Sequence, residues 1–148
     1  MVVLRNSTIA IRDSRDVATV FQDLLRLEDR IDRDKEHFYV CHVNARQQVN
    51  LVELVAVGTL SDAPCHPRET FRRAVSEGSY SILVAHNHPS GDVTPSDADI
   101  RVTRKLHDAG EILNIPLLDH LIITDKSGTF FSFRDNKTQS TVQTGRGK

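Results

Sequence analysis

Residues 81–99 (SILVAHNHPSGDVTPSDAD) carry the patterns of a buried strand, a loop and a helix start in immediate succession. The run at 81–85 (SILVA) is short and apolar, which is typical of a central strand buried on both faces. Residues 90–95 include glycine and proline and predict a loop. Thr94 and Pro95 then predict the start of a helix, with Thr94 as the N-cap and Pro95 at the first helical position.

Four polar residues of this segment are expected to meet. Side chains alternate along an extended chain, so His86 and His88 leave the predicted strand end on one face. Ser96 and Asp99 are three residues apart in the predicted helix and therefore share a face. We expect His86, His88 and Asp99 to hold a metal ion with one position left for water, the open pattern of a catalytic zinc site. Nitrogen and oxygen ligands without thiolate also suit other divalent metals.

Periodic patterns on both sides of this segment predict the rest of the fold. Helices are expected at 15–31, 68–77 and 95–109, and strands at 36–44, 49–60, 81–85, 115–124 and 129–133. Ser14 is the predicted N-cap of the first helix, and Gly78 and Gly110 are expected just past the ends of the other two. The alternation of helices and strands predicts a single α/β (α+β) domain with a mixed central sheet flanked by helices. Residues 1–14 are expected to form an arm or edge strand, 15–133 the domain, and 134–148 a polar, disordered tail.

Composition excludes several classes of protein. With 148 residues, 39% hydrophobic and 26% charged, the chain fits one soluble domain that needs no disulfides. The net charge of −1 provides no overall field to attract nucleic acid. Cys41 and Cys65 form no CxxC pair, so neither a thiolate zinc site nor a redox motif is predicted. The chain has no signal-peptide pattern and no apolar run near the roughly 18 residues of a membrane span, so we expect a cytoplasmic protein without membrane contact.

The spacing of the candidate ligands resembles a known motif. His86-x-His88-Pro89, followed after six residues by Ser96-x-x-Asp99, is similar to the JAMM motif of MPN (JAB) domain metalloproteases. The whole run 86–99 resembles the RadC branch of that family, as do the stretches at 67–69 and 118–120, and the resemblance covers roughly 15–133. It implies an MPN/JAB fold, whose core is similar to that of cytidine deaminases. RadC-like proteins commonly carry an N-terminal helix-hairpin-helix region, and this chain resembles the short forms without it.

The resemblance also implies roles for individual residues. One zinc ion per chain would be held by His86, His88 and Asp99, and Ser96 would donate a hydrogen bond to the oxyanion of the reaction intermediate. JAMM enzymes need a glutamate from an early strand as the base, and Glu36, just before the predicted strand at 37–44, is the matching position.

Three other residues leave alternatives open. Glu53, in the next strand, is the competing carboxylate, and its place inside a strand predicts a side chain that faces solvent. Asp119 and His120 lie in an apolar strand, where they either support the metal ligands or form a satisfied polar pair in the core.

Hydrolysis of a peptide or isopeptide bond in a protein or peptide substrate is the predicted activity. The alternative is a protein linked to DNA repair or recombination, or a scaffold, with a metal site but no peptidase activity. Basic helix faces for DNA would need Arg68, Arg72, Arg73, Arg101, Arg104 and Lys105, whereas ordinary solvated helix charge is the favoured interpretation. The HxE and PCxxC elements of zinc deaminases and the HExxH of other metalloproteases do not occur in the sequence. Exposed strand edges favour a homodimer.

Overall fold

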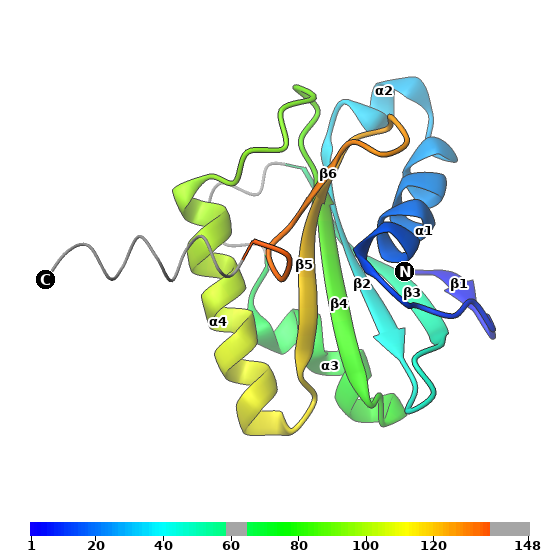
Figure 1. Ribbon diagram of the computed structural model, residues 1–148, viewed down its shortest axis with the longest axis vertical. Helices are drawn as coiled ribbons and strands as arrows, with labels where there is room; N and C mark the ends of the chain where they lie inside the picture. The colour runs from blue at the N-terminus through cyan, green and yellow to red at the C-terminus, as the bar shows by residue number, and fades with distance from the viewer. Residues whose placement is uncertain (59–64, 137–148) are drawn as a thin grey trace, which may run out of the picture.

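A six-stranded mixed sheet forms the centre of the protein, in a computed structural model that describes residues 1–58 and 65–136 (Figure 1). The strands are β1 (Val2–Arg5), β2 (Glu36–Val43), β3 (Val49–Gly58), β4 (Ser81–Asn87), β5 (Leu117–Ile123) and β6 (Phe130–Ser132). Their order across the sheet is β1-β3-β2-β4-β5-β6, and β4 and β5 are parallel while the other neighbours are antiparallel. The mixed α/β sheet predicted from the sequence is therefore confirmed.

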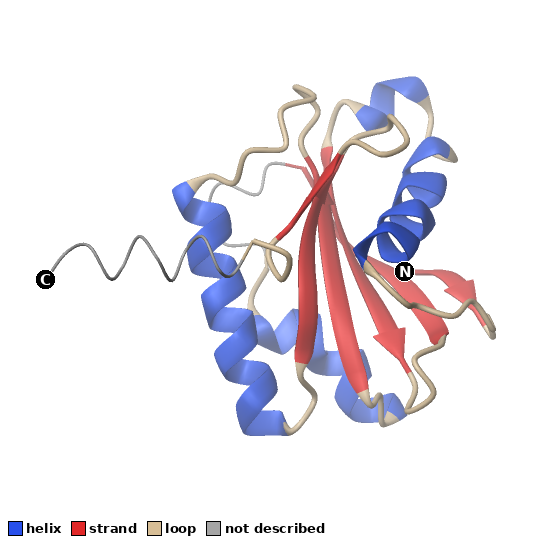
Figure 2. Cartoon of the chain, viewed as in Figure 1, coloured by secondary structure: helices blue, strands red, loops and turns tan. Residues whose placement is uncertain are grey.

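Helices cover both faces of this sheet (Figure 2). Helix α1 (Ser14–Arg26) packs on one face, where its Phe21 joins a core that includes Tyr39 and Leu83. Helices α3 (Pro67–Glu77) and α4 (Asp97–Leu113) cover the other face, where Phe71 and Leu106 join a second core. All of β4 is buried between the two layers, as its apolar run predicts. No helix in the described part of the chain is long and apolar enough to cross a membrane.

Helix α1 is shorter than predicted. Asp13, not Ser14, is its N-cap, because the Asp13 carboxylate accepts a hydrogen bond from the backbone of Asp16. The helix ends at Arg26, and the short helix α2 (Arg30–Arg33) follows as a separate turn. Leu27 and Ile31 continue the apolar spacing, but they are 82% and 79% exposed. The apolar spacing in the sequence therefore continues past the end of the helix face that packs on the sheet.

Helix α4 differs from the prediction at both ends. Its N-cap is Ser96 instead of Thr94, and it continues past Gly110 to Leu113. The left-handed residue that ends it is Asn114, with φ of 57°. Gly110 has another function: a Cβ there would lie 2.7 Å from the carbonyl oxygen of Ile115. Glycine therefore allows the chain to return closely against α4 on its way to β5.

The first residues of the predicted tail contact the sheet. Residues 134–136, assigned to the tail, hydrogen-bond to the sheet: the Arg134 amide donates to the Asp119 carboxylate and the Asn136 amide group to the Ser132 carbonyl. The remainder of the tail, 137–148, lies outside the described residues. So do the last two residues of the strand predicted at 49–60 and most of the loop that follows it.

We expect Gly110→Ala to lower the free energy of unfolding by about 1–3 kcal/mol, the usual cost of adding a methyl group to packed space. The contact with a backbone oxygen outweighs the gain of roughly 1 kcal/mol that alanine brings to a helix. Urea unfolding measures the difference. Glu111→Ala, at the exposed neighbouring position, is the control and should change stability by less than about 0.5 kcal/mol. Equal stability of the two variants would contradict the proposed close packing.

Candidate metal centre

Two histidines at the end of β4 present their rings on one face of the sheet. His86 lies within β4, and the backbone amide of His88 donates to the carbonyl of Ile123 at 3.1 Å, which extends the pairing with β5 beyond the strand. Strand alternation then places both imidazoles on the side of the sheet that α4 covers. The Nε2 atoms of the two rings are 3.1 Å apart.

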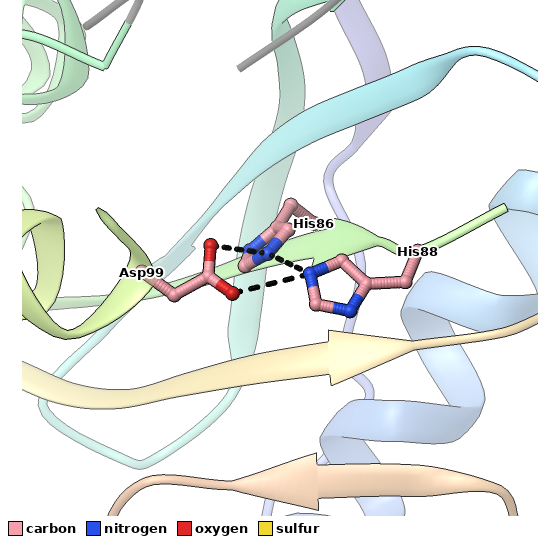
Figure 3. Close-up of side chains that lie close together, drawn as sticks. All are labelled: His86, His88 and Asp99. Atoms are coloured by element: carbon pink, nitrogen blue, oxygen red, sulfur yellow. Dashed lines mark hydrogen bonds and ion pairs between the residues drawn. The ribbon is translucent and has the colours of Figure 1, made fainter. Parts of the chain in front are cut away.

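The start of α4 supplies the third group. Ser96 and Asp99 form a capping box: the Asp99 amide donates to the Ser96 hydroxyl at 3.1 Å, and the Ser96 amide donates to Asp99 Oδ2 at 2.9 Å. This pair of hydrogen bonds fixes the carboxylate so that it faces the two rings (Figure 3). Asp99 Oδ1 lies 3.1 Å from His86 Nε2, and Oδ2 lies 3.1 Å from His88 Nε2. The structure therefore brings together the three residues predicted as ligands.

The geometry of these donors fits a metal ion. A tetrahedral ion with bonds of 2.0–2.1 Å separates its ligand atoms by roughly 3.3 Å, close to the separations of 3.1 Å found here. The three groups each offer one ligand atom within 4.8 Å of the others. The His86 side chain is 2% exposed and that of His88 is 16% exposed, so the site opens toward solvent on the His88 side. Two imidazoles and one carboxylate leave the identity of the metal open among divalent ions.

Charge is concentrated in this small space. Burial alone raises the pKa of Asp99, but the rings of His86 and His88 beside the carboxylate outweigh this effect and hold that pKa far below its usual range. The hydrogen bond to Asp99 raises the pKa of His88, against the opposite effect of burial. In the absence of metal, the contact with Asp99 therefore favours the protonated form of His88.

In each histidine, the Nδ1 atom, on the side of the ring away from the site, has a hydrogen-bond partner. His88 Nδ1 lies 2.8 Å from the carbonyl oxygen of Asp92, an acceptor, so this nitrogen must donate and Nε2 of the neutral ring keeps its lone pair for the site. His86 Nδ1 lies 2.8 Å from Nε2 of His120. His120 is 1% exposed and stacks on Phe133, with ring centroids 5.0 Å apart. Burial lowers the pKa of His120 well below its usual value.

Asp119 and His120, predicted together, have different surroundings. The ring of His120 contacts the ring of His86, one of the three candidate ligands. The Asp119 carboxylate instead accepts hydrogen bonds from the Ser132 hydroxyl and from the backbone amides of His120 and Arg134. Asp119 therefore ties β5 to the end of β6 and contacts no ligand ring.

The two candidate base residues lie in very different places. Glu36 begins β2, two residues before Phe38, which pairs with His86, so alternation directs the Glu36 side chain to the face of the metal centre. Its charge contributes to raising the pKa of His88. Glu53, expected to face solvent, is 6% exposed, because Arg73 of α3 and His42 of β2 contact its carboxylate. The expectation of a solvent-facing side chain was wrong. The contacts with Arg73 and His42 give Glu53 a structural role.

Cys65 lies close to the site but is no ligand in this arrangement. It lines a cavity of about 20 Å³ together with Phe38, His86, Asp99 and His120. Burial, followed by the charges of Glu36 and Asp99, raises the pKa of the Cys65 thiol to about 12. Cys65 is therefore a protonated, buried thiol at neutral pH.

A model of the RadC-like JAB domain matches residues 11–138 of the sequence. The chain belongs to this family. A relative named UPF0758 protein from Pelodictyon phaeoclathratiforme is 51% identical over 105 residues, which cover 71% of this chain and 46% of that protein. UPF0758 proteins from Chlorobium phaeovibrioides and Moorella thermoacetica are 42% and 45% identical over 92% and 87% of this chain, and 58% and 53% of their own lengths. The RadC-like domain described here thus spans about half the length of these relatives, and their names state no activity.

Sequence reasoning missed two residues around the ligands of this RadC-like domain. The backbone of Asp92 orients His88, and the hydroxyl of Thr103 lies 2.6 Å from Nδ1 of His120. Thr103 is one helical turn beyond Asp99, so helical spacing places it on the same face of α4, but nothing local indicates its partner in β5. The role of Asp92 rests on a backbone oxygen, which carries no sequence pattern.

In metal-free protein, Asp99→Asn should return the pKa of His88 toward its ordinary value, because the hydrogen bond from Asp99 is the main cause of its rise. A titration of the His88 ring by NMR with chelator present measures this shift. Asp97→Asn, an exposed carboxylate in the same helical turn, is the control and should leave the titration of His88 unchanged. An unaltered His88 titration in Asp99→Asn would contradict the described contact.

The same pair predicts how the stability of metal-free protein varies with pH. The lowered pKa of Asp99 stabilises the fold above the ordinary carboxyl range, and this contribution is lost as the pH falls. The raised pKa of His88 stabilises the fold below the ordinary imidazole range, and this contribution is lost as the pH rises. The stability difference between wild type and Asp99→Asn should therefore be largest between about pH 4 and 6.5. Urea unfolding across pH measures it, and a difference independent of pH would contradict the assignment.

Proposed function

We propose that this RadC-like domain is a zinc-dependent hydrolase of the JAMM type, which cleaves peptide or isopeptide bonds with an activated water molecule. The observation that carries the proposal is the convergence of His86, His88 and Asp99 to separations of 3.1 Å at an edge open to solvent. Three protein ligands with an open position are typical of catalytic zinc, whereas structural zinc sites are closed by four.

The surrounding residues suit the steps of amide hydrolysis. A bound zinc ion would supply the Lewis acidity that lowers the pKa of a water molecule toward roughly 7. Glu36, on the same face as the ligands, accepts a proton from the attacking water and later gives it to the leaving amine as the C–N bond breaks. The exposed Ser96 hydroxyl accepts a hydrogen bond from the Asp99 amide, and thus keeps its own hydrogen to donate to the oxyanion.

Two hollows beside the centre offer room for an extended chain. One, of about 240 Å³, is bounded by His88, Pro89 and Arg33. The other, of about 440 Å³, runs between α4 and β6, where Pro95 and Phe131 contribute to its wall. A substrate lying across the strand ends would place one carbonyl near the ligands and its flanking residues in these hollows. This arrangement favours a peptide or protein substrate over a compact small molecule.

The charged residues on the surface give less support to a function in DNA binding. Three of the six basic residues considered for a DNA-binding face contact carboxylates: Arg68 and Arg72 contact Glu69, and Arg73 contacts Glu53 and Glu77. With a net charge of −1, the chain offers phosphates no strong field. These observations favour chemistry at the metal centre as the function of the domain.

Metal content is the first test. After purification with zinc supplied, elemental analysis should find about one zinc ion per chain in the wild type and almost none in His88→Ala or Asp99→Ala. The exposed variant Asp97→Asn should retain full occupancy, because its carboxylate lies outside the ligand set. Zinc-free wild-type protein after supplementation would overturn the hydrolase proposal.

Turnover tests the base. Glu36→Gln should retain zinc but lose at least roughly a hundredfold in the rate of peptide hydrolysis, the usual contribution of a general acid–base group. A pool of fluorogenic peptides and casein serves as substrate, and Glu111→Gln, exposed on α4, is the matched control. Full activity of Glu36→Gln would remove Glu36 from the mechanism. Bound zinc without turnover on any substrate would favour the scaffold alternative.

A further inference from the structure

A chain of hydrogen bonds runs behind the ligand His86 and returns to α4. The Thr103 hydroxyl donates to the backbone carbonyl of Asp99 at 2.7 Å, and the same oxygen lies 2.6 Å from Nδ1 of His120. On the other side of its ring, His120 Nε2 lies 2.8 Å from Nδ1 of His86. The chain thus begins at the backbone of one metal ligand and ends at the ring of another.

With both contacts of the Thr103 hydroxyl as hydrogen bonds and a neutral His120 ring, the direction of every bond in this chain follows. A carbonyl oxygen only accepts, so the single hydrogen of the Thr103 hydroxyl must point to Asp99. The hydroxyl oxygen can then only accept from His120, which places a hydrogen on His120 Nδ1. In a neutral ring the other nitrogen, Nε2, is an acceptor, so the shared hydrogen with His86 belongs to His86 Nδ1. The Nε2 atom of His86 is left with a lone pair directed at the metal centre.

The surroundings of His120 favour the neutral ring that this direction requires. Its ring is 1% exposed, stacks on Phe133 and meets the edge of Phe38. A protonated His120 would donate from both nitrogens, and His86 would then carry its hydrogen on Nε2, where it blocks a metal. The aromatic packing disfavours that charge.

We propose that Thr103 is a positioning residue that, through His120, holds His86 in the tautomer able to bind metal. The proposal rests on the metal centre of the proposed function and adds a residue to it. The two histidine ligands differ in the group that orients them. His88 is oriented by the backbone carbonyl of Asp92, which no substitution removes. His86 is oriented by the side chain of His120, whose tautomer depends on its own partner. The hydroxyl at position 103 therefore decides the state of His86.

Thr103→Val tests this role, because it keeps the shape of the side chain and removes the hydroxyl. His120 Nδ1 then faces no acceptor, the opposite tautomer becomes favourable, and His86 receives a hydrogen on Nε2. We expect zinc affinity, measured by competition with a chelating dye, to fall by roughly 10–100-fold, the usual effect of losing a group that orients a ligand. Thr103→Ser keeps a hydroxyl that can donate to the Asp99 carbonyl, and should bind zinc within about threefold of wild type.

A second measurement separates positioning from a general effect on the fold. In metal-free protein labelled with ¹⁵N-histidine, the ring nitrogens of wild type and Thr103→Ser should show His86 protonated on Nδ1, and Thr103→Val should show protonation on Nε2. Thr103→Val with zinc affinity within threefold of wild type, or wild-type His86 protonated on Nε2, would overturn the proposal. If wild type bound no zinc, the proposed function would fail, whereas the ring tautomers would still decide the role of Thr103.

Discussion

The capping box at the start of α4 is the interaction on which the metal centre depends. Asp99 satisfies a free backbone amide of its helix while its two carboxylate oxygens face the rings of His86 and His88. The hydrogen bonds that begin the helix therefore also aim the ligand. A group held by the regular geometry of a helix end needs little further ordering when an ion binds, which is the condition for a preorganised site.

The sheet supplies the second half of this geometry. β4 and β5 are the parallel pair, and α4 connects them, so the helix starts at the same edge of the sheet at which β4 ends. Sites in open α/β sheets gather at this edge, because strand ends and helix starts expose polar groups there. β4 is buried along its whole length, and its pairing with β5 continues to His88, so both histidines extend from a paired strand.

Local patterns predicted that His86, His88 and Asp99 would lie together, and contacts between distant segments account for what was missed. Alternation along a strand suffices to place His86 and His88 together. The choice of Ser96 over Thr94 as N-cap depends on Asp99 reaching back to the Ser96 amide, a competition that two equally suitable cap residues leave open in the sequence. The expectation that Glu53 faces solvent failed because Arg73, from the distant helix α3, folds over it and pairs with its carboxylate.

At the candidate metal centre, a proton and a metal ion would compete for one place. In metal-free protein, the contact between Asp99 and His88 favours a protonated His88 ring, and a metal ion would occupy the space between the same atoms. A metal ion that binds there would release a proton from His88 wherever that ring is protonated, and its affinity would fall as acidity increases. Such competition keeps the buried carboxylate compensated in both states, since a charge left alone there would be costly. The fold can thus maintain a converging set of ligands before any ion arrives, which explains how a site so dense in polar groups is compatible with a stable core.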